Sequence, residues 1–262
     1  MFELRGRRKR LLLTGISVLL VIPFIVPLYT MVYTSFQGRG IDNYKAALQL
    51  PGFWTYFRNS LLIAVATIAI CYFLTMAASF GFSKLRIRSK EVYFWLMMGA
   101  LTMPEVVLLT PMLMMAQKTG IGGTLWSVII PLAAMQIPFT TLLTRSYVDG
   151  IPDSLFEAAR IDGAGTWRQF WSILVPLAKP MGMAIIVLVL INSWNAYLLP
   201  LVLLPGEGQQ VVSQLPMNFK ARYTDDQPKV LAGATLAALP EIIAYVCLQK
   251  QFERGMAAGA IK

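Results

Sequence analysis

The chain has 262 residues, of which 56% are hydrophobic and only 14% are charged, and its mean hydropathy is +0.60. This composition excludes an ordinary soluble domain and favours a membrane protein. The formal net charge of +10 is also typical of nucleic-acid-binding proteins, but we find no basic surface interleaved with aromatic residues. We therefore predict no nucleic-acid partner and expect the basic residues to face anionic membrane lipid.

Six apolar stretches are long enough, or nearly so, to cross a bilayer, which takes about 20 residues of helix. They are residues 11–35, 60–82, 93–117, 124–145, 181–204 and 231–250. The sequence thus predicts an all-α polytopic membrane protein with six transmembrane helices. Although basic residues precede the first stretch as in a signal peptide, the stretch is too long and lacks a small-residue cleavage site, so we expect an uncleaved anchor.

The distribution of Lys and Arg predicts the orientation in the membrane. Most of these 23 residues lie at the amino terminus, in 84–90, in 145–179 or near the carboxyl terminus. By the positive-inside rule these segments and both termini are cytoplasmic. We predict a first domain, 1–58, with the basic amino terminus, the first span and an external loop. A core, 59–262, then holds five spans, a cytoplasmic loop at about 146–180 and a cytoplasmic tail at about 251–262.

The external segment 38–59 is partly amphipathic, so it either lies along the membrane interface or contacts an external partner.

Polar side chains also occur within the later apolar spans. Glu105 in the third span and Glu241 in the sixth each follow a proline, and a carboxylate at membrane depth costs a few kcal/mol on insertion scales, so it usually faces a cavity or a partner.

Amides and one aromatic residue add to this polar set: Gln136 in the fourth span, and Asn192, Trp194 and Asn195 in the fifth. Amides beside an aromatic ring suit a sugar, because hydroxyls need paired donors and acceptors while the ring covers the C–H surface. The alternative is that these groups hydrogen-bond one helix to another. The sequence leaves open which of the two roles they take.

A polar, charged segment, Glu157–Pro176, separates the fourth and fifth spans. Ser154 followed by Glu157, and Thr166 followed by Gln169, each have the spacing of a capping box, so we expect two short helices. The glycines of 162–165 predict a sharp turn between them, because glycine adopts backbone angles that other residues avoid. Prolines 176 and 180 are expected to limit the second helix.

The spacing of this segment resembles the EAA motif of bacterial ABC-importer permeases, and its surroundings resemble the carbohydrate branch related to the maltose permease. The matching positions are Glu157, Ala158, Ala159, Gly163, Ile173 and Pro176, with Val175 where the family has leucine. The resemblance implies a type I importer permease fold, in which this loop is the coupling helix that rests on a separate ATPase. It assigns ATPase coupling to these residues together with Ser154, Arg160 and Asp162.

Ser193–Pro200 resembles the fifth-span signature of carbohydrate permeases, and the family resemblance as a whole covers roughly Asn59 to Lys262. It implies half of the membrane pathway of an ATP-driven sugar importer in the bacterial inner membrane. The implied partners are a second, non-identical permease, two ATPase subunits and an extracellular or periplasmic substrate-binding protein. The external loop 205–229 is expected to face the binding protein, and the tail either contacts the ATPase or is a frayed terminus.

Several chemistries are excluded. There is no histidine, and Cys71 and Cys247 lie in apolar spans, so neither a histidine triad nor a metal site is expected. Gly120–Thr124 lacks the lysine of a phosphate loop, so this chain is not an enzyme, carries no cofactor, and leaves ATP and Mg to the partner ATPase. The alternative functions are an ion-coupled secondary transporter using Glu105 and Glu241, or an ABC permease for peptide or polyol cargo.

Overall fold

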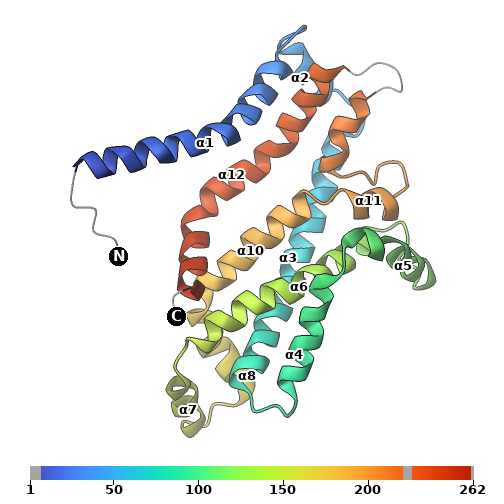
Figure 1. Cartoon of the computed structure of the whole chain (residues 1–262). Coiled ribbons are helices and arrows are strands. Elements are labelled where there is room, and N and C mark those ends of the chain that lie inside the picture. Colours follow the sequence, from blue (N-terminus) through green and yellow to red (C-terminus); the bar gives the residue numbers. More distant parts are fainter. Residues whose placement is uncertain (1–6, 221–225, 261–262) are drawn as a thin grey trace. The chain divides into compact units, whose positions relative to one another are not determined.

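A computed structural model describes residues 7–220 and 226–260, and the regular elements in these ranges are helices (Figure 1). In chain order the first are α1 (Arg7–Ser35), α2 (Asp42–Leu48), α3 (Phe53–Lys84), α4 (Lys90–Gly99), η1 (Ala100–Thr102), α5 (Glu105–Lys118) and α6 (Trp126–Asp149). Then come α7 (Asp153–Ile161), α8 (Thr166–Gln169), η2 (Phe170–Leu174), α9 (Val175–Leu177), α10 (Lys179–Trp194), α11 (Leu198–Leu203), η3 (Val212–Phe219) and α12 (Gln227–Ala260).

The chain divides into two compact units, one of residues 1–51 and 216–238 and one of residues 52–215 and 239–262. In the first unit, the side chain of Asn43 in α2 donates to the carbonyls of Ser35 and Gln37, at 2.9 Å each, and so fixes the turn after α1. The predicted basic amino terminus includes Arg5, and the external loop includes Arg222; both lie outside the described residues. The domain boundary at residue 58 stays a prediction.

The second unit is organised around α3, α6 and α10, which run side by side (Figure 1). Helix α3 packs against both of the others along much of its length. Two hydrophobic clusters fill the interfaces, one toward α7 and the other toward α5 and α11. The contacts are close: Gly182 of α10 lies against the ring of Tyr72 in α3, where a side chain has no room.

In the part of the chain that the structure describes, four helices are long and apolar enough to cross a membrane, and two bent pairs of helices bring the number to six if each pair is one span. The third and fifth predicted spans differ in detail from the apolar stretches 93–117 and 181–204. The third is bent by 105° between Thr102 and Glu105, so Glu105 begins a helix and does not lie in the middle of one. The fifth ends at Trp194, and Leu198–Leu203 forms a separate short helix.

Two polar side chains at the start of α3 hold the loop that follows α11. The amide of Asn59 donates to the carbonyls of Gly208 and Gln210, at 3.0 Å each, and the hydroxyl of Ser60 accepts the backbone N–H of Val212 at 2.8 Å. The helix α3 starts at Phe53, several residues before the predicted span 60–82, and this extension carries Asn59, while Ser60 is the first residue of the predicted span. The first half of the predicted external loop is therefore fastened to the bundle.

The predicted tail continues the last span as a helix. Helix α12 extends to Ala260, and Gly255 is buried where it meets Pro180 and Ala184 of α10. The last two residues, Ile261 and Lys262, lie outside the described residues. Within the range that the structure covers, the tail is thus helical and packed at Gly255.

The tight contact at Gly182 predicts a specific packing defect. In Gly182→Ala the new methyl carbon lies 2.7 Å from the nearest carbon of the Tyr72 ring, so the helices or the ring must shift. Overpacking of this kind costs about 1–3 kcal/mol. We expect a lower melting temperature for the purified protein, and recovery when Tyr72→Leu is added. Gly99→Ala, where the methyl meets open space, is the control, and equal melting temperatures for the two glycine variants contradict the prediction.

Candidate functional site

The segment between α6 and α10 folds as two short helices joined by a turn, as predicted. Helix α7 is followed by residues 162–165, then by α8, a π-helical turn η2 and α9. The predicted capping boxes are wrong. Helix α7 begins at Asp153, with no side-chain cap, and α8 also has none. The side chain of Gln169 instead donates to the carbonyl of Ala164 at 2.7 Å and ties α8 to the turn.

The turn itself depends on Gly163, whose φ is +80°. Its N–H donates to the carbonyl of Arg160 at 3.1 Å, and the N–H of Ala164 donates to that of Ala159 at 2.8 Å. This pair of bonds is a Schellman motif, which satisfies the last carbonyls of a helix and places glycine in the left-handed region. Backbone geometry therefore requires glycine at position 163, which is also the glycine of the EAA-like spacing.

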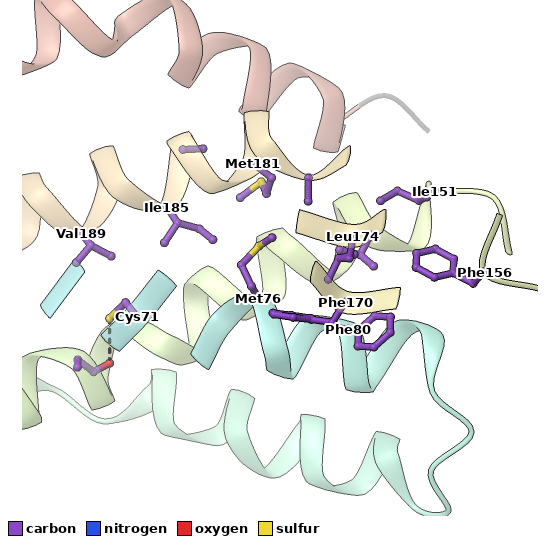
Figure 2. Close-up of a cluster of buried hydrophobic side chains, with 14 residues drawn as sticks. Cys71, Met76, Phe80, Ile151, Phe156, Phe170, Leu174, Met181, Ile185 and Val189 are labelled. Atoms are coloured by element: carbon purple, nitrogen blue, oxygen red, sulfur yellow. Dashed lines mark hydrogen bonds between the residues drawn. The ribbon is translucent and has the colours of Figure 1, made fainter. Parts of the chain in front are cut away.

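We call the segment from α7 to α9, Asp153–Leu177, the elbow, and one of its faces is buried in the bundle (Figure 2). Phe156 of α7 packs against Phe80 of α3 with ring centroids 5.9 Å apart, and Phe80 in turn packs against Phe170 at 5.8 Å. Leu174 lies in the same cluster and is fully buried. The elbow is thus joined to the hydrophobic core of the second unit.

Lys84, the last residue of α3, adds a polar contact to this junction. Its ammonium donates to the carbonyl of Ile151 at 2.6 Å and to the carboxylate of Asp153 at 2.7 Å, and lies 5.5 Å from the centre of the Phe156 ring. The hydrogen bond from Lys84 lowers the pKa of Asp153 below its ordinary value of 3.8. The ion pair is therefore complete above pH 3.8 and weakens only as the pH falls further.

The opposite face of the elbow is exposed and carries most of the predicted coupling residues. Ile161, at the end of α7, is 87% exposed, the largest value among the exposed hydrophobic side chains of the described residues. Around it, the exposed predicted residues are Ser154, Glu157, Ala158, Arg160, Asp162 and Gly163, whereas Ala159 is half-buried. Further along, Ile173 is half-buried and Pro176 exposed.

A second group of predicted residues meets elsewhere in the bundle. Glu105, Gln136, Asn192 and Asn195 line one cavity of about 440 Å³ between α5, α6 and α10. Glu241 of α12 accepts a hydrogen bond from the amide of Asn195 at 2.8 Å. Residues from four predicted spans are thus brought to one place.

Trp194 does not line this cavity. Its side chain is 7% exposed and meets the ring of Phe57 edge-on, with centroids 6.3 Å apart. A contact between Trp194 and a sugar stays a prediction, as does the pathway role of the cavity residues.

Sequence reasoning missed Lys84 and Phe156 as parts of the site. Lys84 looked like one of several basic residues that close a span, and its partner Asp153 is far along the chain. Ile161 had a usable signal, because it is an apolar residue within a polar segment that is predicted to be cytoplasmic.

A family model described as the inner membrane component of binding-protein-dependent transport systems matches residues 74–258, which include both groups of residues. The chain belongs to this family. It is thus a permease, a membrane subunit with no catalytic role of its own and no cofactor.

Curated relatives and solved structures agree with this assignment. The permease is 30% identical over 258 residues to the probable ABC transporter permease protein YurM of Bacillus subtilis, covering 93% of this chain and 86% of YurM. It is 29% identical to the multiple sugar-binding transport system permease protein MsmG of Streptococcus mutans, covering 97% and 96%. A chain in the crystal structure of a bacterial ABC transporter that imports the acidic polysaccharide alginate has a TM-score of 0.79 and 25% identity, with 94% and 98% covered.

The turn of the permease yields a matched pair of variants. Gly163→Ala forces a side chain into the left-handed region, at a cost of about 1–2 kcal/mol. Gly165→Ala adds the same methyl group in open space at a negative φ. We expect faster amide hydrogen exchange across 158–166 in the first variant and no change in the second. Equal exchange in the two variants is the contrary result.

The contact of Lys84 yields another prediction. Lys84→Met removes the donor to the Ile151 carbonyl, and a buried polar group without a partner costs about 1–3 kcal/mol. We expect faster hydrogen exchange throughout α7, with Lys84→Arg retaining part of the protection. Lys90→Met is the control: it also removes a positive charge near Asp153, but the described hydrogen bonds of the Lys90 ammonium go to the Ser83 and Leu85 carbonyls, at 3.4 Å each, and not to α7. Unchanged hydrogen exchange in α7 of Lys84→Met contradicts the claim that Lys84 holds the start of α7.

Proposed function

We propose that this permease forms half of the membrane pathway of an ATP-driven sugar importer in the bacterial cytoplasmic membrane, with both termini in the cytoplasm. The relatives support the cargo class, since MsmG is named for a multiple sugar-binding system and the transporter of similar structure imports a polysaccharide. Its partners are a second permease, two ATPase subunits and a substrate-binding protein outside the membrane. ATP and Mg belong to the ATPase subunits.

The exposed face of α7 is the observation that carries the proposal. A short helix with a buried Phe156 on one side and an 87% exposed Ile161 on the other has an unpartnered apolar surface outside the spans. Exposed apolar groups beside charged ones, here Glu157 and Arg160, are typical of a protein interface. We assign this face to the ATPase subunit.

Coupling then follows from the way in which the elbow is attached. The ATPase pair prefers one arrangement of the permease when ATP closes it, and a ligand shifts a conformational equilibrium only by its preference for one state. Because Phe156 and Lys84 fix α7 to α3, a movement of α7 is passed to the bundle. The bundle then exposes its cavity alternately to the two sides of the membrane.

The cavity lined by Glu105, Gln136, Asn192 and Asn195 is the proposed part of the sugar pathway. Its polar side chains lie on helices that are otherwise apolar. A polar group in a membrane span is costly unless it has a partner or faces water, so a cavity that accepts a polyhydroxylated cargo accounts for the whole set.

Ile161 provides the test of the ATPase contact. In Ile161→Glu a carboxylate replaces the apolar centre of the proposed interface, so we expect at least a tenfold loss of ATPase subunit retained when the complex is purified through the permease. Substrate-stimulated ATP hydrolysis by the complex falls in parallel.

Ile87→Glu is the matched control, since Ile87 is an exposed isoleucine of the segment between α3 and α4, on the same side by the positive-inside rule. It should retain the ATPase. Full ATPase retention by Ile161→Glu, or sugar transport in vesicles that lack any ATPase, overturns the proposed function.

A further inference from the structure

The cavity between α5, α6 and α10 has polar groups from three amide side chains, and their orientation is fixed by the bonds that they make. Asn192 and Asn195 donate from Nδ2 to the carbonyls of Leu188 and Ile191, at 2.9 Å each. Gln136 donates from Nε2 to the carbonyl of Leu132 at 3.3 Å. A backbone carbonyl only accepts hydrogen bonds, so each amide must turn its NH₂ group toward the helix.

Further contacts use up most of the remaining donors. The second hydrogen of the Asn195 amide is directed to Glu241, and Gln136 Nε2 also contacts the hydroxyl of Ser193 at 3.4 Å. Within the described residues, Asn192 alone of the three amides keeps a free amide hydrogen, and the hydroxyl of Tyr197, which also lines the cavity, can donate as well as accept. Most of the donors of this site are therefore turned away from a cargo.

The acceptors, in contrast, are free. Within the described residues no group donates to the Oδ1 atoms of Asn192 and Asn195, and Gln136 Oε1 is buried without a hydrogen-bond partner. A buried acceptor that stays unpaired costs about 1–3 kcal/mol. A ligand rich in hydrogen-bond donors satisfies the Oδ1 atoms of Asn192 and Asn195, which are exposed residues, whereas a ligand that carries only acceptors does not.

The charge of the site has the same sign as its acceptors. Glu105 lines the cavity, and Glu241 lies one hydrogen bond behind it through Asn195. None of the ten lining residues is Lys or Arg, and no basic side chain of the described chain forms an ion pair with either glutamate.

We propose that the cargo which this cavity accepts is a saccharide with a protonated amino group. The inference rests on the proposed function, because it takes the cavity as part of the sugar pathway. An ammonium group supplies three donors and one positive charge, which match the free acceptors and the unpaired glutamates. A uronate presents further acceptors and negative charge, so the site disfavours acidic saccharides such as the alginate carried by the transporter of similar structure.

The test uses the assembled complex in nanodiscs, without its binding protein, so that only the membrane site selects. Three disaccharides are compared by titration calorimetry: β-1,4-linked glucosamine, the same compound N-acetylated, and β-1,4-linked mannuronate. An amine is mostly protonated at neutral pH, whereas its acetylated form is neutral. We expect the amine to bind at least tenfold more tightly than the neutral form, and no measurable binding of the uronate.

Two variants locate the effect. Glu105→Gln and Glu241→Gln keep the size of the side chain, remove its charge, and should each weaken binding of the amine about tenfold while leaving the neutral disaccharide unchanged. Glu207→Gln is the control, because Glu207 is an exposed glutamate outside the cavity. It should bind all three compounds like the natural protein.

The ranking in the natural protein needs no variant and decides the question if a substituted chain fails to fold. Equal binding of the amine and its acetylated form, tighter binding of the uronate, or no binding of the amine overturns the inference. Sugar import itself is then judged separately, by ATP-dependent uptake of any of the three sugars into vesicles with the binding protein present. Uptake there upholds the proposed function while the amino-sugar inference fails.

Discussion

The contact of Phe156 with Phe80 is the interaction on which the elbow depends. It places one face of α7 inside the hydrophobic cluster of the bundle, and Lys84 holds the start of the same helix from α3. With that face buried, the opposite face with Ile161 must be exposed, because α7 is a single short helix. The same packing that fixes the elbow therefore also creates the surface that a partner can bind.

The polar residues of the bundle follow a comparable rule. Asn192 lies within α10 and Asn195 caps its end, in a helix that has little other polarity, and each donates from its NH₂ group to a carbonyl four residues earlier. This local bond lowers the cost of a polar side chain in an apolar setting and leaves the oxygen atom free. The helix thus determines which half of each amide is offered to a ligand.

Much of the fold could be predicted from the sequence, because apolar length and glycine geometry are local properties. The apolar stretches predicted the long helices, and Gly163 predicted the turn, where its φ is +80°. The bend after Thr102 could not be predicted, since Pro104 in a membrane helix is compatible with either a kink or a complete break. The prediction of the capping boxes was wrong because the spacing at Ser154 and Thr166 does not by itself determine where a helix begins. In the structure α7 begins at Asp153, and the side chain of Gln169 bonds to the turn before α8 and not to a cap residue.

The site was predictable only as a set of residue types. Polarity in apolar spans pointed to Glu105, Gln136 and Asn195, but the sequence holds no measure of their separation in space. Their meeting in one cavity depends on how α5, α6 and α10 pack. The same holds for Lys84 and Asp153, which are joined across the bundle.

The axes of Thr166–Leu177 and Lys179–Trp194 differ by 77°, with Ala178 between them. A rigid bend of this angle turns a movement along the axis of the first segment into a sideways displacement of the second. In the proposed coupling mechanism, a movement along the axis of Thr166–Leu177 therefore displaces Asn192 and Asn195, at the far end of α10, nearly at right angles to the axis of α10.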